Sequence, residues 1–391
     1  MQPRYVIVAD PASLRCRFFV RELEEFWAES ARVPDIQIVD WRQLCAGQLP
    51  VDESGPAWLR VESPARDLDV IRGLLQAGQR ARARQRAQQM QLTQRPQAGR
   101  RLQHGTESAE SWSQLREGWI PPQPLLYAGL RACLLTVDEW LGEHPAVTSP
   151  YCMEDVLSLF DKNRTAERLR QNGLPAPASF AADATTGDLP QQVHSTGWEA
   201  AYLKLATGSC ASGVMSVNAG MTAGVTITQQ LDGQYFNTYR VREVRGDELS
   251  DLVRFLLSQT ITVQQAIPKT TVGGQNFDVR VVVLHGRVVA TVFRVSRHPM
   301  TNLHLGGRRG DAQQCRAQIP QRQWLDALDA CVSAASLFEV PCVGIDVAFH
   351  RYTNRPWILE MNAFGDFFPR WVNAAGQTIH RMEIEHTARM M

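Results

Sequence analysis

The segment VGIDVAFHRYTNRPWILEMN (343–362) contains two apolar runs that flank a short polar stretch. Both runs alternate as strands do, so the segment predicts a β-hairpin whose turn is centred on Thr353. Alternate side chains of a strand share one face. One predicted face carries the apolar residues Val343, Ile345, Val347, Phe349, Trp357, Leu359 and Met361. The other predicted face carries Gly344, Asp346, Ala348, Ile358, Glu360 and Asn362.

This hairpin is expected to bring three oxygen-bearing side chains together. Asp346 and Glu360 are equidistant from Thr353 and therefore face each other, and Asn362 points the same way as Glu360. Two carboxylates about 4 Å apart repel by roughly 4 kcal/mol at an effective dielectric constant of about 20, which a shared proton or a cation can relieve. Carboxylate and amide oxygens suit Mg²⁺ or Mn²⁺ rather than zinc. The alternative is an ordinary amphipathic hairpin whose polar face lies in water.

The segment YLKLATGSCASGV (202–214) is a candidate phosphate-binding element. A predicted strand ends in Lys204 and leads into a loop of small residues, which allow backbone N–H groups to approach phosphate oxygens closely. Val214 and Met215 stand where a Walker A loop has Lys and Ser or Thr, so the loop is of another kind. A plain Gly/Ser-rich hairpin has the same composition.

The segment FDVRVVVLHGRVVATVFRVSR (277–297) predicts a second hairpin, with its turn at His285-Gly286. Asp278 and Arg280 share one face of its first strand. An arginine on a rigid strand can clamp a transferring phosphoryl group. The alternative is a surface ion pair between Asp278 and Arg280, which would contribute little to stability.

The second strand of this hairpin ends near Arg294 and Arg297 and is followed by a polar, Gly-terminated loop, TNLHLGG (301–307). Further basic side chains in or beside that loop are His298, His304, Arg308 and Arg309. They either hold an anionic substrate or are solvated, and the sequence does not decide between these alternatives.

The N-terminal part predicts a small α/β domain with a parallel sheet. Residues 5–9 read as a strand, a helix follows from an N-cap at Ser13, and residues 36–39 and 58–61 read as further strands. The turn DPAS (10–13) lacks the glycines of a dinucleotide-binding fingerprint, which argues against an NAD site.

Residues 79–104 form a basic insertion with many arginines and glutamines and no acidic residue. Three interpretations are open: a solvated helix or mobile insertion, a basic lid over an anionic substrate, or a nucleic-acid contact. No aromatic residue is interleaved, so a base-stacking surface is not supported. From Ser149 the chain is predicted to be helical to about Asn172, where Gly173 and Pro175 end the segment.

Composition sets the broad class. The 391 residues suit two or three domains, and 44% hydrophobic and 21% charged residues are normal for a soluble protein with a large core. The formal charge of +1 points to no nucleic-acid partner. No apolar run could span a bilayer and the N-terminus lacks signal-peptide architecture, so we expect a cytoplasmic protein without membrane contact. The eight cysteines are scattered and are expected to be reduced.

Seven segments, in this order, resemble those of the ATP-grasp superfamily of ATP-dependent carboxylate–amine ligases. The resemblance covers about residues 150–370 and is closest to a bacterial branch found in biosynthetic gene clusters. The segments are DKNRTAERLRQNGLPAP (161–177), YLKLATGSCASGV, VQQAIP (263–268), FDVRVVVLHGRVV, TNLHLGG, VGIDVAF and LEMNAFGD (359–366).

The resemblance implies an α/β fold that is α+β in part. A Rossmann-like pre-ATP-grasp domain at 1–148, including the basic insertion, would be followed by a two-lobed ATP-grasp module. Its N-lobe, with the phosphate loop, would span 149–267, and its C-lobe, with the metal site, would span 268–391.

The resemblance also implies site residues. Lys162 and Lys204 would contact ATP phosphates, with Lys204 also near the adenine, and Asp278 would belong to the nucleotide site. The catalytic residues would be Arg280, which binds the γ-phosphate and the acyl phosphate, with Lys204 and Asn302. The phosphate loop would comprise Ser209, Cys210, Ala211, Ser212 and Gly213. The linker reading the adenine edge through its backbone would comprise Gln264, Gln265, Ala266 and Ile267. The Mg²⁺ ligands would be Asp346, Glu360 and Asn362.

One departure from the family pattern concerns the linker. Gln264 and Gln265 stand where acidic residues are usual, and no acid lies between Gln265 and Asp278 to hold the ribose hydroxyls. Backbone contacts can still read adenine, so ATP binding is still expected.

The implied reaction is activation of a substrate carboxylate by ATP as an acyl phosphate, followed by attack of an amine to give an amide, ADP and phosphate. No side-chain nucleophile is required, so Cys210 receives no chemical role. The substrates would be small-molecule or peptide carboxylates and amines that the sequence does not identify. Alternatives are a kinase on the same fold and a non-catalytic nucleotide-binding module. The oligomeric state, including a homodimer, is open.

Overall fold

The computed structural model divides the chain into two compact units, residues 1–149 and 150–390. It describes residues 2–51, 55–64, 67–93, 112, 115–208, 211–366, 368–369 and 371–390. Ser209, Cys210 and residues 94–104 of the basic insertion therefore lie outside the described residues. Within the described ranges, no helix has both the length and the apolar character that crossing a membrane requires.

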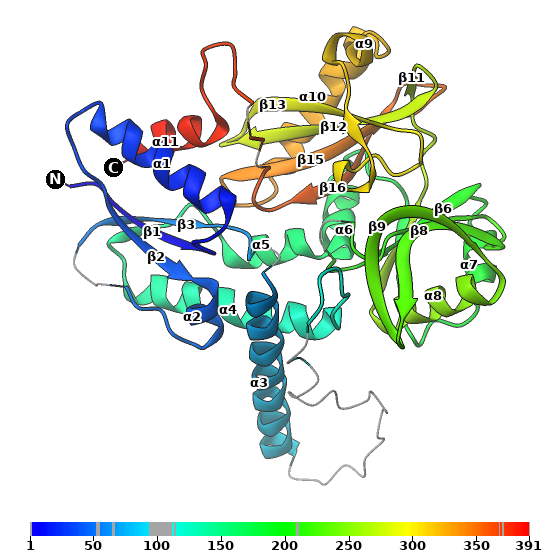
Figure 1. The fold of residues 1–391 in the computed structure, drawn as a ribbon, viewed down its shortest axis with the longest axis horizontal. Coiled ribbons are helices and arrows are strands. Elements are labelled where there is room, and N and C mark those ends of the chain that lie inside the picture. Colours follow the sequence, from blue (N-terminus) through cyan, green and yellow to red (C-terminus); the bar gives the residue numbers. More distant parts are fainter. Residues whose placement is uncertain are drawn as a thin grey trace. The chain divides into compact units, whose positions relative to one another are not determined.

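The first unit contains a parallel sheet, as the sequence predicts. Its strand order is β2-β1-β3-β4, and the bounds are β1 (Arg4–Ala9), β2 (Asp35–Asp40), β3 (Ala57–Val61) and β4 (Val147–Thr148). Its helices are α1 (Leu14–Ala28), α2 (Trp41–Cys45), α3 (Leu68–Thr93) and α4 (Gln123–Glu143) (Figure 1). The predicted N-cap is confirmed, because the Ser13 hydroxyl accepts a hydrogen bond from the Cys16 N–H at 3.1 Å.

Two glycines allow α3 and α4 to cross at very close range. A Cβ atom on Gly129 of α4 would lie 1.8 Å from the Leu74 carbonyl oxygen of α3, and one on Gly78 would lie 2.1 Å from the Leu125 carbonyl oxygen. Only glycine permits this backbone contact. The described part of the basic insertion, residues 79–93, is the continuation of α3 beyond this crossing, and most of its described side chains are exposed. This agrees with the solvated-helix interpretation.

The second unit begins with α5 (Met153–Phe160) and α6 (Lys162–Gln171). The sequence predicts that this stretch is helical, which is confirmed, and Asp161 divides it into two helices. The Asp161 carboxylate accepts hydrogen bonds from the N–H groups of Asn163 and Arg164 and so caps a new helix. Gly173, at φ 69°, ends α6 as predicted.

The first sheet of this unit has the order β5-β10-β6-β7-β8-β9, and each neighbouring pair of strands in it is antiparallel. The strands are β5 (Ser179–Ala182), β6 (Ala200–Leu205), β7 (Met215–Asn218), β8 (Ala223–Leu231), β9 (Gln234–Arg245) and β10 (Ile261–Gln265). The accompanying helices are α7 (Leu189–Ser195) and α8 (Gly246–Ser258), and α8 packs on β8 and β9.

The second sheet of this unit has the order β14-β13-β12-β15-β16, with β11 beside β12. The strands are β11 (Thr271–Val272), β12 (Gln275–Leu284), β13 (Arg287–Ser296), β14 (Arg308–Arg309), β15 (Cys342–Phe349) and β16 (Pro356–Asn362). The remaining helices are α9 (Ala312–Arg316), α10 (Gln321–Ala335) and α11 (Ile379–Ala388). This combination of a parallel sheet and antiparallel sheets confirms the predicted mixed α/β class.

One face of this second sheet is apolar and packs on α10 (Figure 1). The Trp324 ring of α10 stacks on the rings of Phe293 and Phe349, with centroid separations of 5.7 Å and 6.3 Å. The ring centroids of Phe277 and Phe293 are 6.0 Å apart. Since alternate residues point to opposite faces, the even-numbered residues of the central part of β12 and the residues opposite them point away from α10.

The hairpin β15–β16 pairs Asp346 with Glu360, as predicted. A β-bulge then shifts the register by one residue, so that Val347 pairs with Ile358 and Ala348 pairs with Trp357. The predicted faces of Trp357 and Ile358 are therefore exchanged. Ile358 joins the buried apolar side and is 2% exposed, because a one-residue slip moves each side chain to the other face.

We expect Gly129→Ala to destabilise the first unit by about 1–3 kcal/mol, because the new methyl group overpacks the crossing of α3 and α4. Urea denaturation of the purified protein would measure the shift of the midpoint. Gly142→Ala in the same helix is the matched control: a Cβ atom there would meet no other atom within 4 Å, so its midpoint should be unchanged or higher. Equal midpoints for both variants would contradict the close crossing.

Candidate functional site

Strand register gathers charged side chains on the face of the second sheet that points away from α10. Asp278 of β12 lies opposite Arg294 of β13, and Arg280 lies opposite Asp346 of β15. Asp346 in turn lies opposite Glu360 of β16. Directly opposed residues of antiparallel strands point to the same side of the sheet. Charges of both signs therefore lie side by side across four neighbouring strands, with two carboxylates opposed on β15 and β16.

Asp346 is held by two arginines. Arg280 donates from Nε to Oδ1 and from Nη2 to Oδ2, the latter at 3.2 Å, and Arg294 Nη2 lies 3.0 Å from Oδ1. Burial alone would raise the pKa of the Asp346 carboxyl, but the two guanidinium groups outweigh it and hold that pKa below its usual value. Arg280 also donates from Nη1 to Asp366 Oδ2 at 3.0 Å. Asp346 is therefore a charged carboxylate that already has cationic partners.

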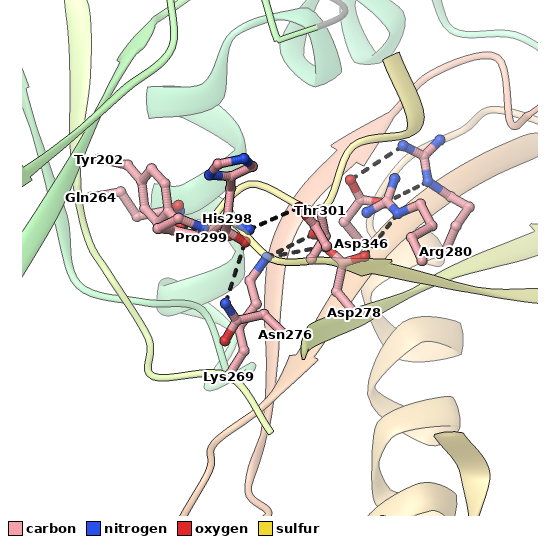
Figure 2. A network of polar contacts seen from close by, with 12 residues as sticks. Tyr202, Gln264, Lys269, Asn276, Asp278, Arg280, His298, Pro299, Thr301 and Asp346 are labelled. Carbon is pink, nitrogen blue, oxygen red and sulfur yellow. Dashed lines mark hydrogen bonds and ion pairs between the residues drawn. The ribbon is translucent and has the colours of Figure 1, made fainter. Parts of the chain in front are cut away.

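Asp278 occupies a buried network beside this pair (Figure 2). Arg294 Nε donates to it at 2.8 Å, Lys269 Nζ lies 3.3 Å from Oδ2, and the Thr301 hydroxyl donates to the same oxygen. Burial opposes the charged form, but Arg294 and then Lys269 hold the pKa of Asp278 well below its usual range. The alternative of a surface pair between Asp278 and Arg280 is wrong, because Asp278 is 2% exposed and each residue has other partners.

Lys204 approaches this charged face from the other sheet of the same unit. Its Nζ donates to Gln264 Oε1 at 2.6 Å, and Gln264 Nε2 donates to the Leu359 carbonyl of β16 at 3.3 Å. Burial lowers the pKa of Lys204 to about 8, although the negative charge of Glu360 opposes this shift; the positive charge of Lys162 acts in the same direction as burial. Lys204 is thus a cation whose charge a bound anion would stabilise.

Lys162 lies at the start of α6 and connects three parts of the site. Its Nζ donates to the Gly208 carbonyl and lies 3.4 Å from Glu360 Oε1. Lys162, Lys204, Gln264 and Glu360 line one pocket, whose remaining wall is largely apolar and includes Leu359 and residues of α6. The structure therefore brings the two predicted phosphate-binding lysines and one predicted metal ligand to the same pocket.

The predicted adenine linker is partly engaged in other contacts. The N–H of Gln265 donates to the Ala178 carbonyl at 2.9 Å, and the N–H of Ala266 donates to the Ala200 carbonyl at 3.0 Å. Gln264 turns its side chain toward Lys204, and Ile267 is buried. Backbone recognition of a base would have to use the other polar groups of this stretch.

The described part of the predicted phosphate loop is anchored by Asn237 of β9. Asn237 Oδ1 accepts from the Gly213 N–H at 3.1 Å, and its Nδ2 donates to the Ser212 hydroxyl at 3.0 Å. Ala211 adopts φ 60°. Like Gly208 just before the loop, Gly213 packs on Leu205, since a Cβ atom at Gly213 would lie 2.6 Å from Leu205 Cδ1. Packing therefore accounts for this glycine in addition to any role toward phosphate.

Asn302, the predicted catalytic residue of the TNLHLGG loop, begins a tight turn. Its carbonyl accepts from the N–H groups of Leu305 at 3.0 Å and Gly307 at 3.3 Å. The segment just before it reaches the other sheet, because the Tyr202 hydroxyl donates to the Pro299 carbonyl at 3.0 Å (Figure 2). The loop thus bridges the two sheets of the second unit.

Glu360 and Asn362 complete the predicted metal-binding set with Asp346. Asn362 Nδ2 donates to the Gly344 carbonyl at 3.3 Å, which fixes the amide orientation. Two opposed carboxylates and an amide oxygen fit a hard divalent cation that takes its remaining ligands from water and phosphate. Among the described residues, no group of three or more His, Cys, Asp or Glu side chains could hold a metal by itself.

Four residues of the site were missed by sequence reasoning: Lys269, Arg294, Thr301 and Asp366. In a regular hairpin with its turn at His285-Gly286, Asp278 would pair with Phe293. In the structure, a bulge after Val282 shifts the register by one residue, so that Asp278 pairs with Arg294. The mismatch of a carboxylate with an aromatic ring was the available signal of a bulge. Lys269, Thr301 and Asp366 lie outside both hairpin strands, so no periodicity could place them.

Solved structures with similar folds span nearly the whole chain. A Chryseobacterium gregarium RiPP-associated ATP-grasp ligase in complex with ADP and a leader and core peptide matches at 12% identity and a TM-score of 0.53, with 100% and 98% of the chains covered. The D-cycloserine synthetase DcsG matches at 13% identity and a TM-score of 0.52, with 99% of each chain covered. The macrocyclase MdnC, bound with precursor peptide MdnA from Microcystis aeruginosa MRC, matches at 13% identity and a TM-score of 0.51, with 99% of each chain covered. At such low identity these likenesses establish the fold alone.

No curated protein matches this chain. A protein-family model does: the YheC/D-like ATP-grasp model matches residues 159–366. The match covers more than half of the chain and runs from α5 to Asp366, so it includes the lysines, the arginines and the carboxylates described above. The chain belongs to the YheC/D-like ATP-grasp family.

Proposed function

We propose that this protein is an ATP- and Mg²⁺-dependent ligase that joins a carboxylate to an amine. The carboxylate oxygen attacks the γ-phosphorus of ATP, and the bond from that phosphorus to the ADP oxygen breaks. The amine nitrogen then attacks the acyl carbon, phosphate leaves, and the amine loses a proton. The products are an amide, ADP and phosphate. Small-molecule or peptide substrates are both compatible with this chemistry.

One observation carries the proposal. In a member of the ATP-grasp family, Lys162, Lys204 and Glu360 line one pocket, and Arg280 and Asp346 lie on the same sheet face as Glu360. Phosphoryl transfer needs cations beside a negatively charged ligand more than it needs a side-chain nucleophile. The arrangement supplies cations and metal-binding oxygens together, which supports transfer of a phosphoryl group.

Each side chain receives a role within this proposal. Lys162 and Lys204 bind phosphate oxygens, and Arg280 neutralises the γ-phosphoryl group as it moves. Asp346, Glu360 and Asn362 would hold Mg²⁺, which would supply positive charge to offset the charge of the phosphate groups. Asp278 acts through Arg294 as a positioning residue, since Arg294 contacts both Asp278 and Asp346.

The charges of the site also indicate whether the metal ion can bind before the nucleotide. Asp346 is paired with two arginines and Glu360 lies 3.4 Å from Lys162. Mg²⁺ alone would add positive charge where the carboxylates are already compensated, which is unfavourable. A nucleoside triphosphate carries the negative charge that compensates both the cation and the arginines beside Asp346. We infer that Mg²⁺ and ATP bind together.

The proposal predicts that ADP is formed over many turnovers only when both a carboxylate and an amine are supplied. Coupled ADP assays with panels of acids and amines would measure this, and Asp346→Asn combined with Glu360→Gln should lower the rate at least 100-fold. Sustained ADP formation without an amine would indicate a kinase, and AMP with pyrophosphate would refute the acyl-phosphate route. If the wild-type protein binds Mg–ATP but yields no ADP with any pair, a non-catalytic module is indicated.

Nucleotide affinity should depend on pH through Lys204. The charged lysine binds phosphate, and because its pKa in the free protein is lowered to about 8, the protein loses that charge as pH rises above 8. The affinity for a nonhydrolysable ATP analogue should therefore be constant below pH 7 and fall by up to tenfold per pH unit above 8. Calorimetric titration would measure it. Lys204→Met should bind weakly at every pH, and a flat wild-type profile to pH 9.5 would contradict the assignment.

Gly344→Ala should disturb Arg280 without replacing a proposed metal ligand. A Cβ atom at Gly344 would lie 2.9 Å from Arg280 Nη1 and 2.9 Å from the Gly365 carbonyl oxygen, so the guanidinium must move. We expect ADP formation to fall at least tenfold while the dissociation constant of the ATP analogue changes less than threefold. Gly187→Ala, where no atom lies within 4 Å, is the matched control and should behave as wild type. Unchanged turnover in Gly344→Ala would argue against a role for Arg280 in transfer.

A further inference from the structure

A second cavity in residues 150–390 shares no lining residue with the nucleotide pocket. It lies where β13 ends and has a volume of about 450 Å³, within the range of small-ligand sites. Tyr239 and Val241 of β9 form one wall, and Leu305 contributes a buried apolar surface. Arg297, His298 and Arg308 also line it. The cavity thus combines an apolar wall with basic side chains.

The basic side chains of this cavity have little local compensation. None of the described residues that line it is acidic. The side chains of Arg297, His298 and Arg308 are exposed, and the Arg308 guanidinium is oriented by a hydrogen bond from Nη2 to Gln275 Oε1 at 2.9 Å. Gln275 is neutral, so this bond positions the guanidinium and leaves its charge available to a ligand.

The apolar wall exists because β9 departs from regular pairing. Thr226 of β8 pairs with Arg242, whereas Thr228 pairs with Asn237, so the stretch 238–241 bulges opposite Ile227. The Thr238 hydroxyl donates to the Ile227 carbonyl at 3.0 Å, and Tyr239 adopts φ 55°, a left-handed conformation that is strained for a bulky residue. Bulges and such backbone outliers concentrate at binding sites.

Both sides of the cavity are continuous with the proposed reaction centre. On β9, Asn237 begins the bulge and also binds Ser212 and Gly213 of the phosphate loop. On the opposite side, the lining residues His298 and Leu305 flank Asn302 in the same loop. A ligand in the cavity would therefore touch the elements that hold the phosphate loop and Asn302.

We propose that this cavity is a substrate subsite that binds a carboxylate group through Arg297 and Arg308, with an apolar or aromatic part of the same substrate against Tyr239 and Val241. The inference rests on the proposed ligase function, because it assigns a substrate class to the same reaction. Guanidinium groups bind carboxylates with two parallel hydrogen bonds. The bound carboxylate is an anchor and is distinct from the group that reacts.

Methyl resonances of the full-length protein can locate a probe molecule. The probe is N-acetyl-L-phenylalanine, and its uncharged analogue is N-acetyl-L-phenylalaninamide. With methyl-labelled protein, the carboxylate probe should shift the resonances of Val241, Val295 and Leu305, and the amide should shift them at least tenfold less strongly at equal concentration. If neither compound shifts them at about 20 mM, or both do so equally, the carboxylate subsite is refuted.

Charge-removing variants test the two arginines. The double variant that carries Arg297→Gln and Arg308→Gln should bind the carboxylate probe at least tenfold more weakly than the wild type. Its affinity for the amide analogue should be unchanged. Arg287→Gln, an exposed arginine at the other end of the same strand β13, is the matched control and should bind the probe as wild type does. An unchanged melting temperature shows that the double variant is folded. Equal probe affinity in the double variant and the control would overturn the proposal.

The same spectra separate this inference from the proposed function. Leu359 lines the nucleotide pocket and not the second cavity, so its methyl groups report on nucleotide binding. Probe shifts without any response of Leu359 to Mg–ATP would support the subsite while refuting the ligase proposal. A response of Leu359 to Mg–ATP without probe shifts at the cavity would refute the subsite alone.

Discussion

The register of the central strand β12 is the constraint on which the charged face depends. It pairs with β13 on one side and β15 on the other, which sets Asp278 against Arg294 and Arg280 against Asp346. The opposite face of the same sheet is covered by α10, so a slip of one residue would bury charges against apolar rings. The packing of the apolar face therefore enforces the arrangement of the polar face.

A consequence of that register is a set of carboxylates that remain charged although they are buried. Asp278 and Asp346 share Arg294, and Lys269 and Arg280 supply further compensation. Buried ion pairs of this kind contribute little to net stability, because desolvation offsets their attraction. Their presence is better explained by the need for a preorganised, charged surface, as transfer of a phosphoryl group would require.

The loop between β13 and β14 connects this surface to the other sheet of the unit. Thr301 is held by Asp278 and Lys269, while the Pro299 carbonyl accepts from Tyr202 of β6. Met300 and Leu305 pack with Val214 and Ile227, close to the phosphate loop. The elements that would bind phosphate therefore contact those that would bind substrate directly, through packing and hydrogen bonds. This is consistent with the family to which the chain belongs.

The sequence by itself determined the parallel sheet after MQPRYVIVAD, the two hairpins, and the pairing of Asp346 with Glu360, because period-two patterns and turn residues act over short distances. It also carried the family resemblance that the match to residues 159–366 confirms. Only the tertiary structure decided the bulges of the β12–β13 and β15–β16 hairpins, the exchange of Trp357 and Ile358, and the partners of Asp278. Those features arise from contacts between segments far apart in the chain, such as Lys269 with Thr301 and Arg280 with Asp366, which no local pattern encodes.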